Sequence, residues 1–118
     1  MVMVSSAHYS QIDADHRAAF SRVVIEEMLR EDLEFEGVVI SDDLAARALS
    51  DVPADQRARR FLEAGGDLTI VGNPRLALGM IATVTSEARS DADFAREVRA
   101  KATRVVTMKA ARGLADCG

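Results

Sequence analysis

Hydrophobic residues gather in three short runs that are separated by longer, periodic stretches. The runs cover residues 2–7, 38–41 and 67–71, and β-branched side chains are frequent in the last two, as is typical of buried strands. Between the first two runs, a helix is predicted from Ser21 to about Asp32. Ser21 can cap it, because its hydroxyl oxygen can accept a hydrogen bond from a backbone N–H that has no partner within the helix. A strand–helix–strand order predicts parallel strands joined by a right-handed crossover.

The periodic stretches predict amphipathic helices. The helix that begins at Ser21 has an apolar stripe at helical spacing, formed by Val24, Ile25, Met28, Leu29 and Leu33. Residues 44–49 predict a short helical piece, and residues 54–64 predict a helix that is ended by Gly65-Gly66. In that second helix we expect Phe61 and Leu62 to face inward, and three basic residues to face outward: Arg57, Arg59 and Arg60.

Two more helices are predicted after the third strand, from Pro74 to about Ala88 and from Ser90 to Gly113. The last has a predicted buried stripe of Phe94, Val98, Ala102, Val105 and Met108, and a basic outer face of Arg96, Arg99, Lys101, Arg104 and Lys109. The pattern therefore predicts an α/β domain over residues 1–118, with three parallel βα units and a C-terminal helix. Three strands leave two open edges, which invite pairing with another chain. We therefore expect part of a larger assembly.

Composition narrows the classes of function. The 118 residues are 48% hydrophobic and 29% charged, an ordinary balance for one soluble domain. A net charge of −4 and the absence of Trp disfavour a nucleic-acid partner. No apolar run approaches the roughly 20 residues of a membrane span, and no signal peptide is indicated. The single cysteine, Cys117, excludes an intramolecular disulfide and favours the cytoplasm. Asp13, Asp15 and His16 match no metal-ligand spacing.

The candidate chemistry lies where the second strand stops. Ser41, Asp42 and Asp43 follow the buried run directly, and carboxylates there need water or partners because their desolvation is costly. Binding and catalytic groups gather at the carboxyl ends of parallel strands. We therefore predict that Asp42 is a catalytic carboxylate. Side chains alternate along a strand, so we expect Asp43 to hold the following loop instead.

These residues resemble a known family. The run Gly37-Val38-Val39-Ile40-Ser41-Asp42-Asp43-Leu44 resembles the nucleophile motif of glycoside hydrolase family 3, in particular its bacterial β-N-acetylglucosaminidase (β-hexosaminidase) branch. Residues 2–13 are similar to that family's sixth barrel strand and following loop, residues 64–68 to its eighth strand, and residues 104–114 to its closing helix. The resemblance implies a partial (β/α)8 barrel that contains strands six to eight.

The resemblance also implies a retaining mechanism without a cofactor or a metal. Asp42 would be the nucleophile that attacks an N-acetylglucosaminide-type sugar, and Asp43 would support it. His8, two residues from the family's histidine position near Ser6, and Ser41 are predicted sugar contacts. The branch implies a cytoplasmic role in peptidoglycan sugar metabolism.

The family's acid/base histidine and its assisting aspartate have no counterpart in this sequence. The chain is therefore expected to carry the nucleophile without the acid/base, and to be weakly active or inactive alone. An upstream polypeptide could complete the barrel, or copies could associate through their open sheet edges.

Two other classes stay open on the sequence. The first is a phosphoacceptor receiver-like signalling domain, in which an acidic pair and a third aspartate bind magnesium. Against it, the pair follows the second strand, Asp67 begins its strand, and no lysine follows a late strand. The second is a non-catalytic remnant or assembly piece that pairs its open edges with another polypeptide. Asp42 by itself could also be a structural aspartate that caps the 44–49 helical piece.

Overall fold

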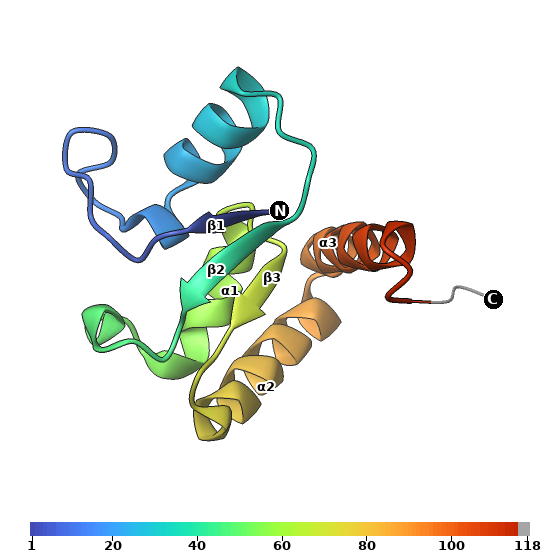
Figure 1. Ribbon diagram of the computed structural model, residues 1–118. Helices are drawn as coiled ribbons and strands as arrows, with labels where there is room; N and C mark the ends of the chain where they lie inside the picture. The colour runs from blue at the N-terminus through green and yellow to red at the C-terminus, as the bar shows by residue number, and fades with distance from the viewer. Residues whose placement is uncertain (116–118) are drawn as a thin grey trace.

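The computed structural model describes residues 1–115, so Cys117 lies outside the described residues (Figure 1). Three strands, β1 (Val2–Val4), β2 (Val39–Asp43) and β3 (Leu68–Ile70), form one parallel sheet in the order β1-β2-β3. The helical elements are η1 (Ala18–Phe20), η2 (Val23–Asp32), η3 (Arg47–Leu49), η4 (Ala54–Gln56), α1 (Arg57–Glu63), α2 (Pro74–Ser90) and α3 (Ala92–Ala111). The three predicted βα units and the final helix are confirmed.

The core lies between the sheet and its helices. Val4 and Val39 from the sheet pack in one cluster with Ile25 of η2 and Phe61 of α1. Figure 1 shows α1 behind the sheet and α2 and α3 beside β3. Met3, on the other face of β1, is 57% exposed. The helices therefore cover one face of the sheet, and Asp42 belongs to the opposite face, which it shares with Ile40 and Met3.

The helix after β1 differs from the prediction in its winding. η2 is a π-helix, and the N–H of Leu33 donates to the carbonyl oxygen of Met28, five residues earlier. Each turn then holds more residues than an α-helical turn, so side chains at α-helical spacing do not stay on one face. Ile25 is buried, but Met28 is 38% and Leu33 is 72% exposed. The predicted stripe was wrong at these last two positions.

Two basic side chains that were expected outside are buried. Arg57 is 7% and Lys101 is 9% exposed. Arg57 opens α1 and donates to backbone carbonyls of the loop before it. Lys101 lies on the side of α3 that faces Asp67, and burial lowers the pKa of its amine while Asp67 opposes that shift. The outward placement of both residues was wrong, because apolar periodicity does not show which polar or charged groups from distant segments will lie near a basic side chain.

An ionic cluster closes the amino end of the sheet. The carboxylate of Asp67, immediately before β3, is fully buried. Its Oδ2 accepts from Arg30 Nη2 at 2.7 Å and from the Val39 N–H at 2.8 Å, and its Oδ1 accepts from Arg104. Arg30 also donates to the carbonyl oxygen of Gly37 at 2.6 Å. One carboxylate therefore joins η2, β2, β3 and α3.

The sheet has two open edges, as predicted. Within residues 1–115, β1 and β3 are each paired with β2 alone. Large apolar side chains are exposed over the two sides of the sheet and its helices: Met3, Tyr9, Ile12 and Leu33 near β1, and Ile70, Leu78 and Ile81 near β3 and α2. No helix in the described part of the chain is long and apolar enough to cross a membrane.

Candidate active site

Asp42 lies at the carboxyl end of the central strand, with its side chain exposed. β2 extends to Asp43, two residues further than the sequence predicted, so both carboxylates belong to the strand itself. Asp42 Oδ1 accepts from the Asp43 N–H at 2.7 Å. Among the described residues its Oδ2 accepts no hydrogen bond, so this oxygen is free to meet another molecule.

The side chains of the two neighbours of Asp42 accept hydrogen bonds from β3 and from the residues that follow β2 and β3. Ser41 is fully buried, and its Oγ accepts from the Ile70 N–H at 3.0 Å. Asp43 Oδ1 accepts from the N–H groups of Gly72 and Ala45, both at 2.8 Å, and these bonds lower the pKa of the Asp43 carboxyl. A register shift in the pairing of β2 with β3 lies between Ile40 and Asp43, where the Ser41 hydroxyl supplies a contact to β3.

Three adjacent side chains, Ser41, Asp42 and Asp43, therefore make different kinds of contact. Ser41, which was expected to touch a sugar, has a buried hydroxyl that bonds strand to strand. Asp43 links β2 to the start of the next loop and to Gly72. Asp42 is the exposed residue of the three, whereas Asp43 is partly buried and Ser41 is buried.

His8 lies in the loop after β1, and its side chain is exposed. Its Nε2 lies 3.0 Å from the carbonyl oxygen of Ala14, which fixes the ring over the loop. Ser6, near the position at which the family carries a histidine, is buried, and its Oγ has no hydrogen-bond partner among the described residues.

The same loop is organised by Asp13. Its carboxylate accepts from Ser21 Oγ at 2.6 Å, from the N–H groups of Asp15 and His16 at 3.0 Å, and lies 3.3 Å from His16 Nδ1. The pKa of the Asp13 carboxyl is lowered from 3.8 to about 2, and the hydrogen bond from Ser21 makes the largest contribution. Ser21 Oγ also accepts from the Val24 N–H at 3.2 Å, so it caps η2 as predicted.

Replacing Ser21 with alanine should raise the pKa of Asp13 toward 3.8, because the largest contribution to its lowering is lost. The folded-state pKa is depressed, so Asp13 stabilises the wild-type fold above pH 3.8, and this stabilisation is lost as the pH falls toward 2. Loss of the cap should cost about 1 kcal/mol at neutral pH. Carboxyl-carbon NMR titration and urea unfolding measure the two effects. The exposed Ser50→Ala serves as a control, and an unchanged Asp13 pKa in Ser21→Ala would contradict the assignment.

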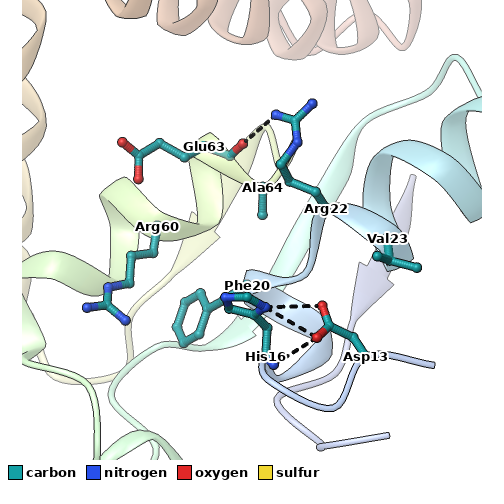
Figure 2. Close-up of a pocket in the computed structure, with 8 residues that line it drawn as sticks. All are labelled: Asp13, His16, Phe20, Arg22, Val23, Arg60, Glu63 and Ala64. Atoms are coloured by element: carbon teal, nitrogen blue, oxygen red, sulfur yellow. Dashed lines mark hydrogen bonds and ion pairs between the residues drawn. The ribbon is translucent and has the colours of Figure 1, made fainter. Parts of the chain in front are cut away.

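A cavity of about 400 Å³ lies beside Asp13, between the start of η2 and α1 (Figure 2). Phe20, Arg22, Arg60 and Glu63 line it together with His16, and Asp42 does not. Figure 2 shows the Asp13 carboxylate turned toward the His16 ring. Because that carboxylate already accepts several hydrogen bonds, it is a structural anion of the loop. No group of three or more His, Cys, Asp or Glu side chains in residues 1–115 is arranged to hold a metal ion.

Three parallel strands with helices between them, and an exposed carboxylate at the carboxyl end of the central strand, have the arrangement of one part of a (β/α)8 barrel. The glycosyl hydrolase family 3 N-terminal domain model matches residues 1–108. The chain therefore belongs to glycosyl hydrolase family 3, as the resemblance implied.

The relatives are all longer than this chain. A β-hexosaminidase of Thiobacillus denitrificans is 36% identical over 106 residues, which cover 88% of this chain and 28% of the relative. A β-hexosaminidase of Bordetella pertussis is 44% identical over 78 residues, 64% of this chain and 22% of the relative. The crystal structure of β-N-acetylhexosaminidase from Beutenbergia cavernae superimposes with a TM-score of 0.86 at 41% identity, over 92% of this chain and 32% of that protein. The chain thus spans about a quarter to a third of these relatives.

The sequence predicted that Asp42 and Asp43 lie at the end of the second strand, but it did not predict that Arg57 is buried and donates to the carbonyl oxygen of Leu44 beside them. Arg57 reads as one of three surface arginines in a helix. Its signal in the sequence is its place directly after the 53–56 turn, at the helix start, where a long side chain can reach back to loop carbonyls.

Proposed function

We propose that this chain is the nucleophile-bearing part of a retaining β-N-acetylhexosaminidase, and that Asp42 is its nucleophile. The observation that carries the proposal is the exposed Asp42 carboxylate at the carboxyl end of β2, between Ser41, which is bonded to Ile70 of β3, and Asp43, which is bonded to Gly72 after β3. The names of the relatives, β-hexosaminidase and β-N-acetylhexosaminidase, support the class of reaction.

In the proposed reaction, an Asp42 carboxylate oxygen attacks the anomeric carbon of the sugar. The bond to the leaving oxygen breaks, a glycosyl ester forms on Asp42, and water later releases the sugar with its original configuration. The Asp43 N–H, bonded to Asp42 Oδ1, orients the carboxylate so that Oδ2 can attack. Asp43 is a positioning residue in this scheme.

The general acid and most sugar contacts are proposed to come from the remainder of the barrel. His8 keeps a proposed sugar contact because it is exposed in the loop after β1, whereas Ser41 is assigned to the strand pairing. The two open sheet edges and the coverage of 28–32% of the longer relatives support completion by further βα units. The motif further suggests an N-acetylglucosaminide from peptidoglycan as substrate, and a cytoplasmic location.

A glycoside with an activated leaving group tests the nucleophile without a general acid. With 2,4-dinitrophenyl N-acetyl-β-glucosaminide, the leaving group departs as dinitrophenolate and needs no proton. We expect intact-mass spectrometry to show one N-acetylglucosaminyl group added to the 118-residue chain, and peptide mapping to place it on Asp42. General base help, which typically contributes about 10²–10⁴-fold, is absent, so the ester should persist and turnover should be little or none.

Asp42→Asn should remove the adduct, and Asp55→Asn, an exposed carboxylate away from β2, should keep it. An adduct of equal amount in Asp42→Asn, or none on the wild-type chain, would contradict the proposal. Rapid wild-type turnover that Asp42→Asn abolishes would support the nucleophile but overturn the expected dependence on the rest of the barrel.

The positions of the three aspartates do not fit the receiver-like alternative. Asp42 and Asp43 lie at the carboxyl end of the sheet, and the third aspartate, Asp67, is bound to two arginines at the amino end. These carboxylates therefore do not converge on one ion site.

A further inference from the structure

Arg57 is a buried cation that binds neutral oxygens. Its side chain is 7% exposed, its Nε donates to the carbonyl oxygen of Val52 at 2.9 Å, and its Nη1 donates to that of Leu44 at 2.8 Å. Among the described residues no carboxylate lies within salt-bridge distance of it. Burying a guanidinium is costly unless its N–H groups find acceptors, and here the two carbonyl oxygens are those acceptors.

The two carbonyls mark the two ends of one loop. Leu44 follows the acidic pair directly, and Val52 precedes the turn into α1. The planar guanidinium presents donors in a fixed fork, which sets the separation of its two acceptors more strictly than a lysine could. Arg57 therefore closes the 44–52 loop at its base.

The base of this loop is continuous with Asp42 through backbone bonds. The Leu44 N–H donates to the Ile70 carbonyl oxygen at 2.9 Å, so the Leu44 backbone is held by β3 on one side and by Arg57 on the other. Ala45 N–H donates to Asp43 Oδ1, and the Asp43 N–H donates to Asp42 Oδ1. A displacement of the Leu44 backbone would therefore change the position of the Asp42 carboxylate through these two hydrogen bonds.

We propose that Arg57 is a positioning residue for Asp42: by holding both ends of the 44–52 loop, its guanidinium keeps the end of β2 in the geometry in which the Asp42 carboxylate can attack a sugar. This inference rests on the proposed function of Asp42. Arg57 does not touch the sugar, and it acts through Leu44 and Asp43.

The first measurement is residue-resolved amide hydrogen exchange by NMR on the full chain. Arg57→Met removes both carbonyl bonds, and we expect the Ala45 and Gly72 amides, the two that donate to Asp43, to exchange about tenfold faster. Arg57→Lys, which can keep one bond, should lie between Arg57→Met and the wild type. The matched control is Arg60→Met on the exposed side of α1, which should leave both amides unchanged.

The second measurement is the rate at which the activated glycoside labels Asp42. We expect about a tenfold slower rate in Arg57→Met, partial recovery in Arg57→Lys and no change in Arg60→Met. The exchange rate of the Val39 amide, which donates to Asp67 at the opposite end of the sheet, should stay constant and so exclude general loosening.

The outcomes separate the two proposals. If the wild-type chain is not labelled, the assignment of Asp42 fails. If it is labelled but Arg57→Met changes neither the labelling rate nor the exchange of Ala45 and Gly72, the role of Arg57 is overturned. If Arg57→Met does not fold, Arg57→Lys decides, and wild-type values for both measurements in that variant overturn the role.

Discussion

Replacing Asp67 with alanine is expected to lower the free energy of unfolding by about 3–5 kcal/mol, the range found when one partner of a buried ion pair is removed. The substitution leaves the guanidinium of Arg30, whose side chain is 13% exposed, without its carboxylate. It also leaves the buried Val39 N–H without an acceptor and removes the partner of Arg104. Urea unfolding followed by circular dichroism measures the loss.

The control for this prediction is an ion pair at the surface. Asp51 pairs with Arg17 at 3.3 Å, and the Asp51 side chain is 60% exposed. Asp51→Ala should cost little stability, because water solvates the partner that remains. An Asp67→Ala variant that loses no more stability than Asp51→Ala would show that the cluster does not hold the amino end of the sheet together.

Replacing Phe61 with alanine is expected to cost about 3–5 kcal/mol, the usual range for removal of a buried aromatic ring. Phe61 is fully buried in the cluster between the sheet and the helices. Its ring also lies against Gly66, where an added Cβ would come within 2.1 Å of Cε1. The ring therefore fills the space in which α1 turns back toward β3, and alanine would leave a cavity there.

Leu78→Ala on α2 is the matched control, because Leu78 is 73% exposed and should contribute little. Gly66→Ala gives a second view of the same contact, and overpacking against the ring should cost about 1–3 kcal/mol. Comparable stability of Phe61→Ala and Leu78→Ala in urea would be inconsistent with a core centred on this ring.

Much of the fold was predictable because local signals agree with it. The three strands follow their β-branched runs, Ser21 caps η2, and Gly65 ends the α1 segment with a φ of +108°. α2 continues to Ser90, and Asp91 caps α3 through bonds from Asp93 N and Phe94 N, so α3 begins at Ala92, two residues later than predicted. Such signals depend on neighbours in the chain, which a sequence displays directly.

The misassigned positions depend on contacts between distant segments. Arg57 and Lys101 are buried because loop carbonyls and Asp67 lie near them in space, and periodicity reads any basic residue as a surface residue. Met28 and Leu33 left the predicted stripe because η2 winds as a π-helix. At the candidate site, alternation along the strand correctly separated Asp42 from Asp43, but the bond from Ile70 to Ser41 crosses 29 residues and had no local signal.

The Asp67 cluster has a consequence for how such a domain can evolve. The charged centre that ties η2, β2, β3 and α3 together lies at the end of the sheet away from Asp42. Insertions or exchanges in the loops around Asp42 would not remove any of these contacts, so the loops at that end can vary while the scaffold is kept. A substitution at Asp67 is less tolerable, because loss of its carboxylate would remove contacts that connect four segments.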